Sequence, residues 1–119
     1  MERRFKRGLW SNQSGATAVE FAVVAPAFLA FVLGIIHLSL LAFTVASLNY
    51  SVEQGARCAA LRSIPSCPAD RYYFAPGTLP VFTYATAACG TSLTASVAYN
   101  LHVIVFQASI PLRASACFP

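Results

Sequence analysis

The longest apolar run in the chain is FAVVAPAFLAFVLGII, Phe21–Ile36, and its apolar character continues with interruptions to Leu48. As a helix, the whole stretch would be about 42 Å long at about 1.5 Å per residue, which exceeds the bilayer hydrocarbon core of about 30 Å. The pattern therefore predicts a transmembrane segment over about residues 18–44.

Beyond Ala42 the pattern becomes amphipathic, with apolar residues at steps of three and four. These residues are Leu41, Val45, Leu48, Val52, Ala56 and Ala59. Such spacing is typical of a helix with one buried face, so we expect the membrane helix to continue after the bilayer. Pro65 disfavours helical geometry at Ile64, which predicts that one helix covers residues 16–62.

Pro26 lies inside the predicted span. Proline has no amide hydrogen to donate, so a helix kink is expected there. Proline is also commoner in transmembrane helices than in soluble ones, so tolerance without any special role is an equal alternative.

The rest of the chain, residues 63–119, predicts a small extracytoplasmic domain. Odd positions over residues 93–105 are apolar while most even positions are polar, which is typical of a half-buried strand. A second alternation, over residues 110–117, can pair with it antiparallel across a turn near Gln107–Ser109. Prolines and glycines divide the preceding stretch into loops and short extended pieces. The expected fold class is α+β: a long N-terminal helix, then a small domain with a β-hairpin or small antiparallel sheet.

Composition agrees with a membrane protein. Of the 119 residues, 57% are hydrophobic and 10% are charged, whereas roughly 25% are charged in an ordinary soluble domain. The five charged residues in Glu2–Arg7 carry +3 of the net charge of +4. Basic residues before an apolar span favour a cytoplasmic N-terminus. The later arginines are scattered along the chain, so no nucleic-acid partner is expected.

All four cysteines follow the apolar run. They are Cys58, Cys67, Cys89 and Cys117. No CxxC pair or Cys/His ligand set is present, so we expect no metal site, and an even number of cysteines outside the membrane favours two disulfides in an oxidising compartment. We predict the pairs Cys58–Cys67 and Cys89–Cys117, although sequence permits three pairings and buried free thiols are an alternative.

Candidate catalytic residues are few. The chain has two histidines, His37 in the apolar helix and His102 on the polar side of a strand, and its one aspartate is Asp70. Nothing places them in a nucleophile and base arrangement, and no phosphate-binding glycine loop is present. We therefore expect no enzymatic activity and no cofactor.

Glu20 is a carboxylate at the start of the membrane segment, where a charge costs a few kcal/mol. One interpretation is that it reaches back to the cytoplasmic interface and interacts favourably with the helix N-terminus. The other requires a positive partner at membrane depth. Cleavage after Gly15 would create one, because Ala16 would then carry a free α-amino group and Glu20 would be the fifth residue.

The stretch SGATAVEF, residues 14–21, resembles the processing site of type IV pilin-like proteins. Together with the apolar run, the amphipathic SVEQGARCAA and the terminal ASACFP, it is similar to the TadE family of pseudopilins from tight-adherence (Flp pilus) systems. The resemblance implies a basic cytoplasmic leader, residues 1–15, removed by a prepilin peptidase between Gly15 and Ala16. It also implies that Glu20, followed by the aromatic Phe21, is needed for processing or assembly.

The resemblance further implies a minor pilin-like subunit that acts in pilus assembly, initiation or adhesion. Its partners would be the prepilin peptidase, other pilin-like subunits, pilus platform proteins and inner-membrane lipid. The N-terminus would lie in the bacterial cytoplasm and the C-terminal domain in the periplasm or outside the cell, with possible incorporation into a surface filament.

Two alternatives remain open. The chain could be a signal-anchored or secreted disulfide-bonded binding domain unrelated to pili, with the aromatic cluster RYYF, residues 71–74, as its contact surface or as core. In that case Val45–Ser47 could serve as a signal-peptidase site, although the apolar run is longer than the 7–15 residues usual in a signal peptide. An enzyme is the less favoured alternative.

Overall fold

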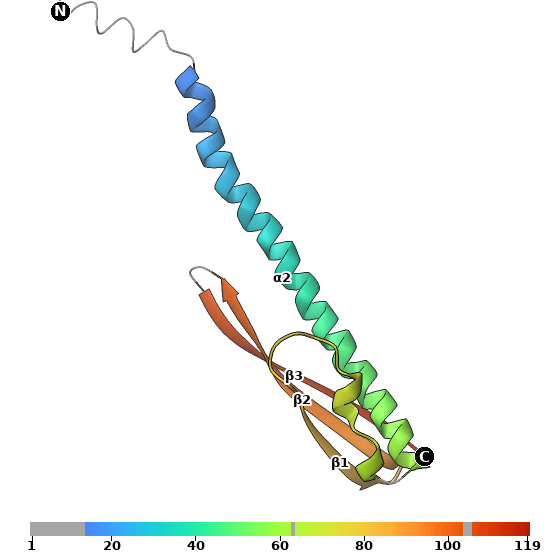
Figure 1. Cartoon of the computed structure of the whole chain (residues 1–119). Helices are drawn as coiled ribbons and strands as arrows, with labels where there is room; N and C mark the ends of the chain where they lie inside the picture. Colours follow the sequence, from blue (N-terminus) through green and yellow to red (C-terminus); the bar gives the residue numbers. More distant parts are fainter. Residues whose placement is uncertain (1–13, 63, 104–105) are drawn as a thin grey trace, which may run out of the picture. The chain divides into compact units, whose positions relative to one another are not determined.

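The computed structural model describes residues 14–62, 64–103 and 106–119. Within these residues the elements follow one another as α2 (Ser14–Leu61), the short 3-10 helices η1 (Ile64–Ser66) and η2 (Ala69–Tyr72), and strands β1 (Val81–Ala87), β2 (Gly90–Val103) and β3 (Phe106–Phe118) (Figure 1). One long N-terminal helix followed by a three-stranded antiparallel sheet with two disulfides confirms the α+β fold class.

The single helix α2 agrees with the predicted range of residues 16–62 to within two residues at each end. It continues through Pro26, whose missing amide hydrogen removes one intrahelical hydrogen bond. The kink predicted at Pro26 stays a prediction. The helix ends shortly before Pro65, where the chain enters η1.

The described chain divides into two compact units within this one helix. Residues 14–36 belong to the first unit, and residues 37–119, including the second half of α2, belong to the second. The described part of the first unit is helix alone. The second unit is the folded domain, so the domain's core includes helix residues that lie N-terminal to the predicted boundary at residue 63.

The sheet has the order β1-β2-β3, and both pairings are antiparallel. The turn expected near Gln107–Ser109 is wrong, because Val103 pairs with Phe106 and β3 already includes residues 107–109. Polar Gln107 and Ser109 suggested a loop, but they occupy exposed positions on a strand. Strand β1, which the sequence analysis did not single out, pairs Ala87 with Gly90; Gly90 adopts a φ of 117°, which favours glycine.

One face of the sheet and one face of α2 form the core. Its buried residues are Leu48, Val52, Ala56, Ala69, Tyr73, Ala75, Leu93, Ala95, Val97 and Ala114. The predicted alternation of β2 is confirmed at Leu93, Ala95 and Val97. The predicted helix stripe is wrong at Val45, which is 38% exposed, whereas polar Thr44 and Ser47 are buried.

Candidate functional site

The candidate processing site lies in the first turn of α2. Gly15 and Ala16 are both exposed, and a Cβ built on Gly15 meets no atom within 4 Å. The predicted leader extends over residues 1–15, of which residues 1–13 lie outside the described part of the chain. Because the first four amides of a helix have no intrahelical acceptor, the bond between residues 15 and 16 lies where the helix is held by the fewest hydrogen bonds.

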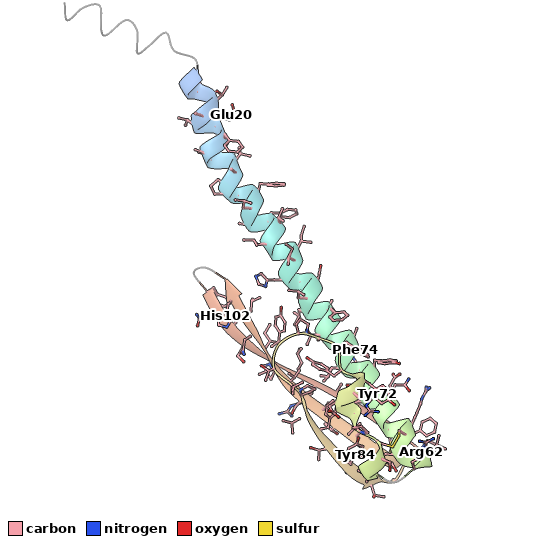
Figure 2. The ribbon with its side chains drawn as sticks, viewed as in Figure 1. Glu20, Arg62, Tyr72, Phe74, Tyr84 and His102 are labelled. Atoms are coloured by element: carbon pink, nitrogen blue, oxygen red, sulfur yellow. A yellow bond between two sulfur atoms is a disulfide. The ribbon has the colours of Figure 1, made fainter. Side chains whose placement is uncertain are left out.

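Glu20 is one helical turn from Ala16 (Figure 2). Residues four apart share a helix face, with a rise of about 6 Å between them. The Glu20 side chain is exposed and lines a shallow depression with Thr17, Phe21 and Val24. A new α-amino group at Ala16 and the Glu20 carboxylate would therefore lie on the same side of the helix.

The apolar residues of the first unit surround the helix on all sides. They include Val19 at 66% exposure, Phe21 at 73%, Val24 at 58%, Phe28 at 63%, Leu29 at 59% and Phe31 at 68%. A helix that is apolar all round is typical of a buried or membrane-spanning helix. In the part of the chain that the structure describes, α2 is the one helix long and apolar enough to span a bilayer, with a mean hydropathy of 2.4 in its most apolar segment.

Two disulfides close one end of the second unit. Cys58, near the end of α2, is joined to Cys67, which follows η1. Cys89, in the β1–β2 turn, is joined to Cys117 near the end of β3. Both pairs are the ones expected from the sequence. The first ties the helix end to the connecting segment, and the second ties the β1–β2 turn to the end of β3.

The helix and the sheet approach each other closely at Gly55. A Cβ at this position would contact the Leu93 side chain and lie 2.9 Å from the Ala69 Cβ. Tyr84 on β1 extends toward the same place, and its hydroxyl donates a hydrogen bond of 2.6 Å to the Cys67 carbonyl. Burial raises the pKa of the Tyr84 phenol, a nearby backbone hydrogen bond at Ala69 opposes this, and the Asp70 charge adds to it.

The RYYF cluster is divided between the core and the surface. Tyr73 is buried, and burial raises the pKa of its phenol. Phe74 is 66% exposed, and its backbone amide donates a 2.8 Å hydrogen bond to the Ser47 hydroxyl. Tyr72 makes an edge contact with Tyr50, with 6.4 Å between ring centroids (Figure 2). The core interpretation is therefore right for Tyr73, while the contact-surface interpretation remains available for Phe74.

Comparison with protein-family models gives a match to the N-terminal part of the chain. A family model described as TadE-like protein matches residues 15–57. The chain carries a TadE-like segment. No curated protein and no solved structure matches the chain. The match confirms the TadE resemblance over residues 15–57.

The TadE-like segment contains Gly15, Ala16, Glu20, Phe21 and Pro26, so all of the predicted processing and helix residues lie inside it. It ends at Arg57, before the first cysteine. The similarity of the terminal ASACFP to the family lies beyond the match and stays a prediction.

Two residues of the TadE-like segment escaped the sequence analysis. Both are buried: Ser47 accepts a hydrogen bond from the Phe74 amide, which follows η2, and Gly55 faces Leu93 of β2. Apolar periodicity does not find them, because one is polar and the other has no side chain. The available signal was the spacing of small residues on the helix, which permits close approach of another element.

Proposed function

We propose that this chain is a minor pilin-like subunit, a pseudopilin, of a tight-adherence pilus system. A prepilin peptidase cuts it between Gly15 and Ala16, and the mature helix then packs with the helices of other pilin-like subunits. The second unit lies outside the cytoplasm and acts in pilus assembly, initiation or adhesion. The proposal concerns packing between subunits and includes no catalytic step.

The observation that carries the proposal is the continuity of α2 from Ser14 to Leu61. A cut after Gly15 keeps the whole apolar segment joined to the folded unit, as a helix-anchored subunit requires. A cut before Ser47 would remove Thr44, which is 3% exposed in the folded unit, and would place a new terminus at a residue that bonds Phe74. The continuity therefore favours the pilin-like maturation over a signal-peptidase cut.

In this proposal Glu20 provides the charge that pairs subunits during assembly. No other Asp, Glu, Lys or Arg occurs from residue 8 to residue 52. An unpaired charge in hydrocarbon costs a few kcal/mol, so pairing with the α-amino group of a neighbouring subunit rewards one axial register of the helices. A subunit displaced along the filament axis would leave both charges unpaired.

The experiment coexpresses the full chain with a prepilin peptidase and determines the N-terminus of the product by mass spectrometry. We expect a chain that begins at Ala16. Replacing Gly15 by leucine should leave the leader attached. Gly34→Leu is the matched control, since a Cβ at Gly34 also meets nothing within 4 Å, and it should be processed normally. A mature chain beginning at Ser47 or later would contradict the proposal.

A further inference from the structure

The two ends of the unit formed by residues 37–119 differ in charge. All of its Asp, Glu, Lys and Arg residues lie within Glu53–Arg71 or at Arg113. Its helix residues before Glu53, residues 37–52, and the long stretch between Arg71 and Arg113 contain none. Histidines aside, one end of this unit is therefore built from uncharged residues only.

Contacts along α2 show which end this is. A Cβ on Gly55 would contact Leu93, and Thr44 lines a pocket of about 120 Å³ together with residues 97–100 of β2. Moving along β2 from Leu93 to Asn100 thus corresponds to moving back along the helix from Gly55 to Thr44. Strand β2 runs antiparallel to α2, and its C-terminal end lies toward the start of the unit at His37.

The hairpin of β2 and β3 extends further in the same direction. From the middle of residues 97–100 to Val103, a strand advances about 15 Å at about 3.3 Å per residue. From Thr44 back to His37, a helix advances about 10 Å at about 1.5 Å per residue. The end of the hairpin, where Val103 pairs with Phe106, is therefore level with or beyond His37. Figure 2 shows His102 near this end of the hairpin.

The hairpin end has one apolar and one polar face. The register places Tyr99 opposite Ile110 and Leu101 opposite Ala108 on the face that continues the core. Phe106 is on the same face and is 59% exposed. The opposite face carries exposed polar residues: Asn100, His102, Gln107 and Ser109. Aromatic side chains with both an apolar and a polar part, such as Tyr99, are enriched at the membrane interface.

We propose that this hairpin end, residues 99–102 and 106–110, rests in the interfacial layer of the bilayer that α2 spans, with Phe106 in contact with lipid. Lipid is the occupant because His37 lies near the outer end of the predicted span, residues 18–44, so the level that the hairpin end reaches falls in the outer part of the bilayer. Charged residues are costly near hydrocarbon, and the hairpin contains none beyond the pairing of Ser96 with Arg113, which favours this orientation. The inference requires the membrane span but neither cleavage nor pilus assembly.

The test uses tryptophan fluorescence in the full chain. Trp10→Phe removes the one native tryptophan. Single reporters are then introduced as Phe106→Trp, as Phe28→Trp in the apolar segment, and as Leu61→Trp, whose parent side chain is 80% exposed at the charged end. Each chain is reconstituted into phosphatidylcholine vesicles with or without brominated acyl chains. We expect bromine to quench the Phe28→Trp and Phe106→Trp reporters and to leave the Leu61→Trp reporter unchanged.

Each other outcome overturns the proposal in a recognisable way. Quenching of the Phe28→Trp reporter but not of the Phe106→Trp reporter would show that α2 spans the bilayer while the hairpin does not contact it. An absence of quenching in both reporters would contradict the membrane span as well. Equal quenching of Phe106→Trp and Leu61→Trp would indicate adsorption without orientation. A Phe106→Trp signal that is blue-shifted, unquenched and lost on dilution with lipid would assign this surface to a second copy of the chain.

A folding control accompanies each reporter. Non-reducing peptide mapping should find both disulfides, and near-ultraviolet circular dichroism should match the parent chain. A second measurement replaces residue 101 or 102 by cysteine and labels the thiol with a water-soluble reagent. The membrane should protect this thiol from labelling. Phe106→Leu keeps the apolar contact, so the protection should be retained in that variant. Phe106→Glu should lose that protection. Equal protection in both variants would overturn the proposal.

Discussion

Residues 14–36 and residues 37–61 belong to the same helix, yet their side chains have opposite surroundings. In the first segment Phe21 is 73% exposed and Val23 is 70% exposed. In the second, Leu48 and Val52 are each 1% exposed. The two segments share a backbone conformation and differ in what surrounds them.

The difference shows two ways in which the apolar side chains of a helix are kept from water. A helix in lipid requires apolar side chains on all sides, since no face meets water. A helix against a sheet requires only one face, but that face must fit another surface. Small residues such as Ser51 and Gly55 serve that fit, and they would be poor choices for hydrocarbon contact alone. The Ser51 hydroxyl donates to the Leu48 carbonyl, so its burial leaves no unsatisfied donor.

The sharpest test of this comparison makes the same leucine to alanine substitution in the sheet surface that covers the second segment and in the first segment itself. Leu93, which packs against the second helical segment, is fully buried, whereas Leu33 in the first is 43% exposed. Leu93→Ala should lower the free energy of unfolding of the folded unit by about 3–5 kcal/mol, because it leaves a cavity in the core. Leu33→Ala should leave that free energy unchanged. Urea unfolding in detergent micelles, followed by near-ultraviolet circular dichroism, measures both; similar losses would contradict the division into units.

The disulfides should give the next largest effect, confined to the folded unit. Replacing Cys89 and Cys117 together by alanine opens a loop with a sequence separation of 28, whereas the Cys58–Cys67 separation is 9. Loop entropy predicts losses of about 3–4 and about 2–3 kcal/mol respectively. Urea unfolding of the two double variants measures the order. The bromine quenching of Phe28→Trp serves as the control, and a loss of that quenching would mean that the apolar segment depends on the folded unit.

Glycine to alanine substitutions sharpen the comparison further. Gly55→Ala places a methyl group against Leu93 and Ala69, so we expect a loss of about 1–3 kcal/mol that exceeds the gain in helix propensity of about 0.5–1 kcal/mol. Gly34→Ala meets nothing within 4 Å and should not destabilise the chain. Thermal unfolding compares the two, and a stabilised Gly55→Ala variant would show that the close approach at this position is not required.

The smallest expected effect concerns alkaline pH. Burial, with a contribution from Asp70, raises the pKa of the Tyr84 phenol above its ordinary value of 10.0. The folded state therefore favours the neutral phenol: its stability is complete below pH 10 and falls as the pH rises through the range above it. Tyr84→Phe removes one hydrogen bond, at about 1 kcal/mol near neutral pH, and should make the alkaline decline shallower.

The control for this prediction is Tyr50→Phe, because the Tyr50 side chain is 47% exposed. Free energies of unfolding measured from pH 7 upward should decline in this variant as they do in the parent chain. An alkaline decline in Tyr84→Phe as steep as that of the parent would contradict the assignment of the effect to Tyr84.

Much of the architecture could be predicted from the sequence, because it follows from local pattern. The apolar run and the stop at Pro65 define α2, and alternation over residues 93–105 predicts β2. The TadE-like motif was visible in Gly15 and Glu20. These features depend on neighbours within a few residues, which the sequence displays directly.

The errors occur where distant parts of the chain meet. The expected turn at Gln107–Ser109 was wrong because polar residues also occupy the exposed positions of a strand, and only the pairing of Val103 with Phe106 fixes the register. Val45 was placed in the buried stripe, but the sheet contacts the adjacent face of the helix instead. Exposure at one helical position depends on the direction from which a partner approaches.

The sequence by itself determined the membrane-type helix, its continuation, and four cysteines on its C-terminal side, since hydropathy and periodicity are properties of local chain chemistry. Only the tertiary structure decided that Gly55 is a contact point, that Ser47 bonds the amide of Phe74, and that the hairpin end near Phe106 lies toward the start of the folded unit. Those facts depend on strand register and on the packing of helix against sheet, which arise between residues far apart in the chain.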